Sequence, residues 1–168
     1  MSKRNGLSLV EVLISTLLVG VLLVSALKAV GAVLRHRDSL TDRSRALMLA
    51  NGLLSEILEK GYADPTDADG FGCETDEDAS DRQTFDDVDD YANWLRLPPE
   101  NRLGVAVANS EAFQRSATVF YVDPSDISEQ VETDLGIKRI RVAVEVNGVE
   151  LAVVEALRTQ AHDEMQQQ

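Results

Sequence analysis

The 168-residue chain contains little cysteine and little histidine, and this scarcity excludes several kinds of site. Cys73 is the single cysteine, so neither an intramolecular disulfide framework nor a multi-cysteine metal knuckle can form. The two histidines are His36 and His162, and the short motifs of zinc proteases, serine hydrolases and P-loop proteins do not occur. We therefore expect no enzymatic function; a hydrolase that works through its carboxylates is the one catalytic alternative.

Positive charge is also scarce, because 16 Lys and Arg residues face 29 Asp and Glu residues and the net charge is -13. A nucleic-acid-binding protein needs a basic surface to neutralise phosphates, so we predict no nucleic-acid contact. Hydrophobic residues make up 44% of the chain, which is enough for a core and excludes global disorder. A large block of them lies before residue 35, so the rest of the chain has a smaller core than this average indicates.

One long apolar run lies near the N-terminus. Residues 12–27 carry no charge, and the run extends back to Leu7 with Glu11 as its only interruption. As an α-helix, the 21 residues 7–27 would measure about 31 Å, close to the roughly 30 Å hydrocarbon core of a bilayer. The sequence therefore predicts a transmembrane segment over 7–27, preceded by a short basic segment, 1–6.

Glu11 is unusual, because a carboxylate inside an apolar run costs a few kcal/mol unless it is paired or near an interface. The string Gly6-Leu7-Ser8-Leu9-Val10-Glu11, followed by the apolar run, resembles the N-terminal motif of type IV pilin-like proteins, the prepilins and pseudopilins. The resemblance implies that residues 1–6 are a leader, that prepilin peptidase cuts after Gly6, and that Leu7 becomes the N-methylated N-terminus. Glu11 matches the family's assembly glutamate, whereas Leu7 replaces the more common phenylalanine.

The resemblance also implies a function. The chain is expected to be a minor pilin-like subunit of the bacterial inner membrane that assembles with other pilin or pseudopilin subunits into a type IV pilus or a type II secretion pseudopilus. Its C-terminal domain would lie in the periplasm or in an extracellular filament. In a bundle of such helices, Glu11 of one subunit could pair with the Leu7 amine of the next. After loss of the leader, the side-chain charge becomes 14 minus 29, or -15, and such an acidic outer domain favours a minor subunit.

Two other interpretations of the N-terminus remain open. A secretory signal peptide also has a basic start and an apolar run, with residues 24–26 as a small-residue cleavage site. A simple single-pass anchor is the second alternative. Neither needs Glu11. Basic residues flank the run on both sides, so the predicted orientation depends on the family resemblance.

From residue 28 to residue 61 the pattern becomes one-sided. Apolar residues recur at spacings of three, four or seven, and Gly61 follows as a C-terminal stop signal. This stripe consists of Val30, Val33, Leu34, Leu40, Leu47, Leu54, Ile57 and Leu58. It predicts an amphipathic continuation of the transmembrane helix over 28–61, with a break near Gly31 or residues 35–38 as the alternative.

The next segment, 62–104, is predicted to be an acidic loop region, because residues 64–90 hold twelve acidic side chains and a single basic one, Arg82. A solvated loop is the expected state, in which Cys73 is a partly covered thiol; a disulfide between subunits is the alternative for this residue. The alternative is a calcium site formed by Asp67, Asp69 and Asp76, because closely spaced carboxylates around a glycine are typical of calcium loops. A membrane-tethered or secreted calcium-binding module with no filament role is accordingly the alternative function.

The C-terminal part is rich in strand signals. Residues 117–122, 138–146 and 149–157 are predicted strands, and the last two are joined by Asn147-Gly148, the preferred pair for a two-residue hairpin turn. Residues 105–108 add a short strand, so that an antiparallel sheet spans 105–160, and 161–168 form a disordered tail. The predicted fold is therefore α+β, with one long N-terminal helix packed on a small C-terminal antiparallel sheet.

Overall fold

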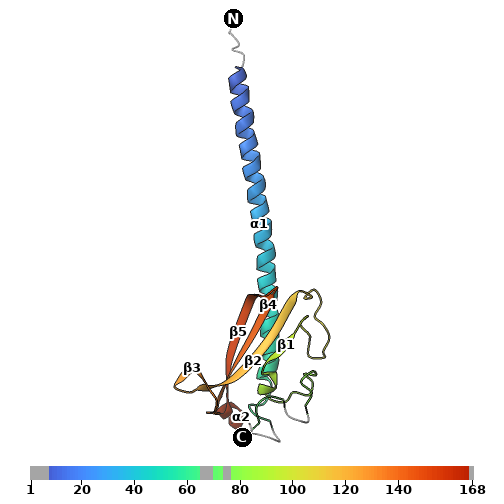
Figure 1. Ribbon diagram of the computed structural model, residues 1–168, viewed down its shortest axis with the longest axis vertical. Helices are drawn as coiled ribbons and strands as arrows, with labels where there is room; N and C mark the ends of the chain where they lie inside the picture. The colour runs from blue at the N-terminus through green and yellow to red at the C-terminus, as the bar shows by residue number, and fades with distance from the viewer. Residues whose placement is uncertain (1–7, 65–69, 74–76, 167–168) are drawn as a thin grey trace. The chain divides into compact units, whose positions relative to one another are not determined.

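The structure is a computed structural model that describes residues 8–64, 70–73 and 77–166. It divides into two compact units, Met1–Thr41 and Asp42–Gln168. Figure 1 shows the order of the elements along the chain, which begins with the 50-residue helix α1 (Leu9–Leu58) and ends with the short helix α2 (Gln160–Gln166).

The first unit contains the apolar part of α1. The stretch Leu9–Gly31 has 23 residues and a mean hydropathy of 2.4, and it is long and apolar enough to cross a membrane by length and composition. The alternative of a break near Gly31 or residues 35–38 is wrong, since α1 continues without interruption from Leu9 to Leu58. No proline falls within these residues, so beyond the first turn each backbone N–H group can bond within the helix.

The second unit contains one antiparallel sheet of five strands. Its strands are β1 (Trp94–Arg96), β2 (Phe113–Asp123), β3 (Asp126–Val131), β4 (Ile137–Val146) and β5 (Val149–Thr159). The strand order is β1-β2-β4-β5, and β3 pairs with β2 beside this path. The predicted α+β class with a C-terminal antiparallel sheet is confirmed.

The hairpin between β4 and β5 forms at the predicted turn. Asn147 has a φ of 52° and Gly148 a φ of 75°, and Val146 pairs with Val149 across the turn. Positive φ at both central residues is what a type I′ turn requires, and Asn-Gly meets this requirement at the lowest steric cost.

The core of the second unit is one hydrophobic cluster to which α1, the sheet and the loops contribute. From α1 come Ala46, Leu49, Ala50, Leu53 and Ile57, and the strands add residues such as Val142 and Val144. The buried face of α1 differs from the predicted stripe: Leu53 is fully buried, whereas Leu47 is 48% exposed. The reason is that Ala46 and Ala50 belong to the face, although their small side chains did not count in the apolar pattern.

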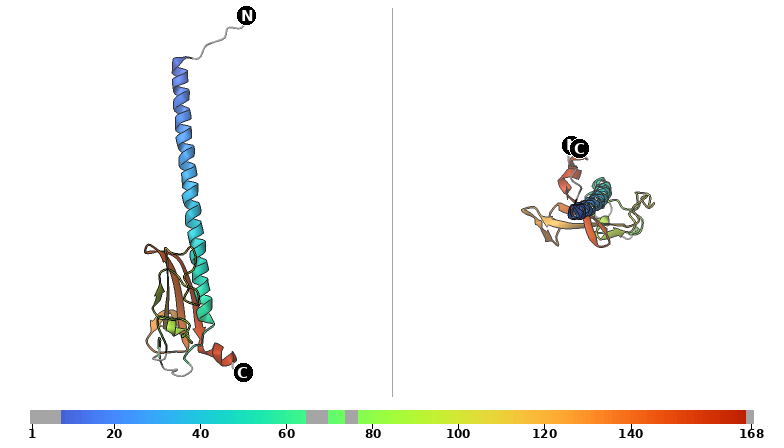
Figure 2. Two further views of the ribbon diagram at one scale, coloured as in Figure 1. Left: turned by 90° about the vertical axis from the view of Figure 1, so that its right-hand side faces the viewer. Right: turned by 90° about the horizontal axis from the view of Figure 1, so that it is seen from above.

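Several predicted loops and ends have regular structure instead. The 3-10 helix η1 (Asp89–Tyr91) and strand β1 lie within the predicted acidic loop, and the predicted strand 105–108 is reduced to a single bridge between Glu100 and Ala106. Helix α2 occupies the predicted disordered tail and directly follows β5 (Figure 2). Its Asp163 carboxylate accepts the Tyr62 N–H at 2.6 Å and also bonds Arg158, which holds this end in place.

Candidate functional site

The predicted processing site lies outside the described residues, because both Gly6 and Leu7 precede Ser8. Glu11 is described, and it lies in the first turn of α1 with an exposed side chain. A carboxylate here is favourable to the helix itself, since the N-terminal end of a helix carries partial positive charge. The same position also leaves the carboxylate accessible to another molecule.

Ser8 caps the start of α1. Its hydroxyl oxygen accepts the Val10 N–H at 3.3 Å, and its carbonyl oxygen accepts the Val12 N–H at 3.1 Å. Ser8 and Glu11 have the S-x-x-E spacing of a capping box, in which both side chains satisfy N–H groups of the first turn. Glu11 therefore has a local structural role available in addition to the assembly role that the family motif implies.

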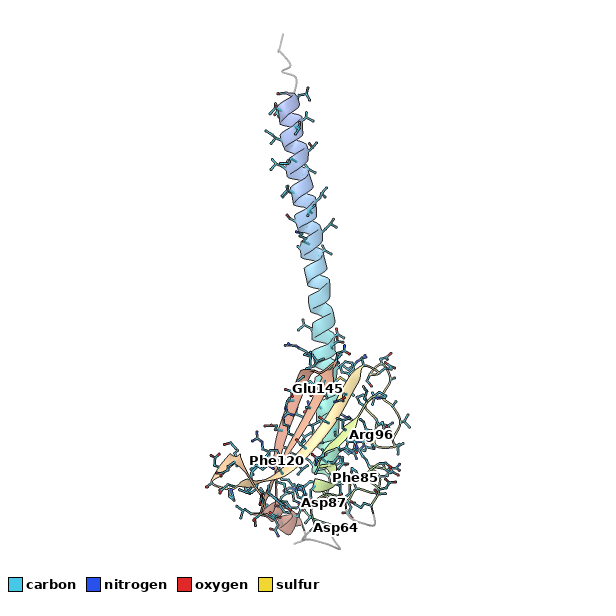
Figure 3. All side chains as sticks on the ribbon, in the orientation of Figure 1. Asp64, Phe85, Asp87, Arg96, Phe120 and Glu145 are labelled. Atoms are coloured by element: carbon cyan, nitrogen blue, oxygen red, sulfur yellow. The ribbon has the colours of Figure 1, made fainter. Side chains whose placement is uncertain are left out.

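The predicted calcium ligands Asp67, Asp69 and Asp76 also lie outside the described residues, so this site stays a prediction. The neighbouring run Asp86-Asp87-Val88-Asp89-Asp90 is described, and it differs from the expected solvated loop. Asp87, Asp89 and Asp90 are each no more than 2% exposed, and we call these three residues the acidic cluster. Figure 3 labels Asp87 near the end of the sheet that lies away from Glu145.

The acidic cluster folds as a tight turn because its carboxylates bond its own backbone. Asp90 Oδ2 accepts the N–H groups of Asp86 and Asp87, both at 2.9 Å, and Asp87 Oδ1 accepts those of Asp89 at 2.8 Å and Asp90 at 3.2 Å. Val88 belongs to the hydrophobic core and anchors the turn. Short acidic side chains favour such local bonds over regular secondary structure.

Lys138 of β4 is the cation of the acidic cluster. Its Nζ donates to the Asp89 carboxylate and to the Tyr62 carbonyl oxygen, and it lies 3.9 Å from Asp87 Oδ2. The Tyr62 ring lies 4.6 Å from the same nitrogen. Burial and the neighbouring Asp89 carboxylate raise the pKa of Asp87 to about 8, because one lysine cannot balance several buried carboxylates.

One group of described side chains has the donor set of a metal site. Cys73 Sγ and one carboxylate oxygen each from Glu77 and Asp90 all lie within 4.8 Å of one another. This group is not apparent in the sequence, because its members are separated along the chain and the acidic run that contains Asp90 is typical of a solvated loop. The signal that could have found it is the apolar spacing of Phe85, Val88 and Tyr91, which anchors the acidic cluster in the core.

In comparisons with protein-family models, with curated proteins and with solved structures, the chain matches none. Its function is therefore inferred from its own residues and geometry.

Proposed function

We propose that this chain is a minor pilin-like subunit. Prepilin peptidase would remove residues 1–6 and methylate Leu7, and the mature chain would assemble through its N-terminal helix into a type IV pilus or a type II secretion pseudopilus. Before assembly it would reside in the bacterial inner membrane as a single-pass protein. The observation that carries the proposal is Glu11, a carboxylate in the first turn of a helix whose stretch Leu9–Gly31 is long and apolar enough to cross a membrane.

Glu11 needs a partner in such a location. A carboxylate within hydrocarbon costs a few kcal/mol when it is alone, and a charge pair in low dielectric offsets this cost. The cut after Gly6 would create an ammonium group at Leu7 that lacks a counter-ion. Pairing of this amine with Glu11 of a neighbouring subunit would satisfy both charges and would fix the axial register between two helices.

The second unit supports the same proposal. Ala46, Leu49 and Leu53 of α1 belong to one buried cluster with residues of the sheet, so the C-terminal part of the helix contributes to a folded domain. An apolar helical segment followed, in the same helix, by a segment that packs on a small antiparallel sheet is the architecture that the pilin-like resemblance implies. The large excess of acidic residues, 29 against 16, favours a minor subunit because like-charged domains resist dense self-packing.

The capping role of Glu11 offers a sharp test, because glutamine preserves a capping box and alanine does not. We compare Glu11→Gln with Glu11→Ala in cells that assemble the filament. Thr16→Val is the matched control, since Thr16 lies in the same apolar helix and its hydroxyl donates to the Leu13 carbonyl oxygen at 3.0 Å. The measurements are membrane insertion of each variant and its recovery in purified filaments.

If Glu11 pairs with a neighbouring amine, both Glu11 variants insert into the membrane, but their recovery in filaments falls at least about tenfold, as expected when one partner of a buried ion pair is lost. Thr16→Val assembles as the unaltered chain does. Normal assembly of Glu11→Gln together with a defect in Glu11→Ala would assign Glu11 to helix capping alone and would contradict the proposal.

A further inference from the structure

A thiol and two carboxylates meet beside η1. Gly72 N–H donates to Asp89 Oδ2 at 3.2 Å, and Cys73 Sγ donates to the Asp90 carbonyl oxygen at 3.5 Å, so this part of the loop is held against the acidic cluster. The Cys73 sulfur lies within 4.8 Å of carboxylate oxygens of Glu77 and Asp90. We propose that Cys73, Glu77 and Asp90 bind a zinc ion.

The Asp90 side chain points independently to a cation. Asp90 is 2% exposed, and its Oδ2 already accepts two backbone N–H groups. Its Oδ1 is buried and has no hydrogen-bond partner among the described residues. A buried carboxylate oxygen without a partner is costly, because it has lost its hydrogen bonds to water and has no protein hydrogen bond to replace them. A metal ion bound at Oδ1 removes this cost.

The charge balance of the acidic cluster also favours a bound cation. Asp87, Asp89 and Asp90 are buried together, and both salt bridges that reach them from the described residues come from Lys138. Glu77 adds a further carboxylate at the Asp90 side. A divalent cation at this point would supply the positive charge that one lysine does not, and bound cations are the largest local charges in such sites.

The donor set selects zinc rather than calcium. Calcium takes six to eight oxygen ligands, whereas zinc binds thiolate sulfur at about 2.3 Å and carboxylate oxygen at about 2.0–2.2 Å in a tetrahedron. Three protein ligands leave the fourth position to water. Tetrahedral ligand atoms lie about 3.3–3.8 Å apart, so the observed spread of up to 4.8 Å requires a closing movement of about 1 Å. Zinc binding also releases the Cys73 proton, which makes the sulfur a thiolate ligand.

This site differs in residues and in metal from the predicted calcium site, and it does not depend on the filament function. To test it, the full-length chain is purified in detergent with a reducing agent and is freed of metal with a chelator. Zn²⁺ and, separately, Ca²⁺ are titrated by calorimetry. Co²⁺ is then used as a spectroscopic probe, because cobalt bound to a thiolate gives a charge-transfer band in the near ultraviolet.

The variants are Cys73→Ser, Glu77→Gln and Asp90→Asn, with Asp78→Asn as the matched control. Asp78 follows Glu77 directly, but its exposed carboxylate bonds Ser80 instead of joining the group. Cys73 is exposed, so Cys73→Ser keeps the fold and remains informative even if Asp90→Asn unfolds the protein.

We expect one Zn²⁺ per chain, a loss of affinity of at least about tenfold in each ligand variant, and no change in Asp78→Asn. The cobalt band is expected in the unaltered chain and in Asp78→Asn but not in Cys73→Ser. The proposal is overturned by the absence of zinc binding, by equal zinc affinity in Cys73→Ser, or by binding of Ca²⁺ alone.

Discussion

Glu56 of α1 and Arg82 form an ion pair of 2.7 Å in which the two side chains are only 8% and 3% exposed. The Tyr91 hydroxyl donates to the same Glu56 oxygen at 3.1 Å, and Arg82 also donates to the Glu100 carbonyl oxygen at 2.9 Å. The Arg82 guanidinium lies 4.8 Å from the centre of the Trp94 ring. This pair therefore connects the end of α1 with the loop and with β1 inside the second unit.

Loss of Arg82 should destabilise the fold strongly. Arg82→Met leaves the buried Glu56 carboxylate with the more distant and half-exposed Arg102, whose Nε lies 3.8 Å from Glu56 Oε2. Because the close, buried partner is lost, we expect a decrease of roughly 3–5 kcal/mol in the free energy of unfolding, measured by urea denaturation. Arg139→Ala is the control, because its pair with Glu155 is 27% and 36% exposed and should contribute no more than about 1 kcal/mol. Similar losses of stability in both variants would show that the buried ion pair contributes no more than the exposed one.

The buried face of α1 can be tested with two leucines. Leu53 is fully buried and Leu47 is 48% exposed. Leu53→Ala should therefore lower the free energy of unfolding by about 2–5 kcal/mol, whereas Leu47→Ala should change it by less than about 1 kcal/mol. Urea denaturation of both variants measures this difference. A larger loss in Leu47→Ala than in Leu53→Ala would show that Leu47, and not Leu53, lies on the buried face of α1.

Two glycines should respond to alanine with opposite signs. Gly52 lies inside α1 and a Cβ atom there would meet nothing within 4 Å, so Gly52→Ala should stabilise the protein by about 0.5–1 kcal/mol. Gly148 also has open space around it, but its φ of 75° is unfavourable for any residue with a Cβ atom. Gly148→Ala should lower the melting temperature, and an increase in both variants would contradict the turn geometry.

Stability should fall as the pH rises through the neutral range. The pKa of Asp87 rises from its ordinary value of 3.8 to about 8, so between these values the folded protein holds a proton that the unfolded chain has lost. Each pH unit in this window should lower the free energy of unfolding by up to about 1.4 kcal/mol. Asp87→Asn should remove this contribution. Urea denaturation from pH 4 to pH 8 in the presence of a chelator measures how the free energy of unfolding of the unaltered chain and of Asp87→Asn depends on pH. The same dependence in both proteins would show that Asp87 does not have a raised pKa.

The elements that could be predicted from the sequence depend on local signals. Asn147-Gly148 specifies its turn through backbone conformations that few other residues adopt, and the β-branched residues on both sides specify the strands. The apolar run of α1 is equally local, because its length alone matches a bilayer. These features need no knowledge of distant parts of the chain.

The elements that could not be predicted depend on distant partners. A run of aspartates is normally solvated, and Asp89 is buried here because Lys138, 49 residues further along the chain, reaches it from β4. Helix α2 is held through contacts between Asp163 and Tyr62, which are 101 residues apart. The group of Cys73, Glu77 and Asp90 likewise exists only after the loop has folded against η1. No local pattern encodes such contacts.

The N-terminal residue of the mature protein decides whether the chain is processed as a pilin-like subunit. We would purify the chain from the membranes of cells that contain prepilin peptidase and determine its N-terminal residue and mass by mass spectrometry. The predicted result is a chain that starts at an N-methylated Leu7. A chain that retains Met1, as an uncleaved anchor would, or one that starts at Leu27, as a signal-peptidase product would, rules out processing by prepilin peptidase.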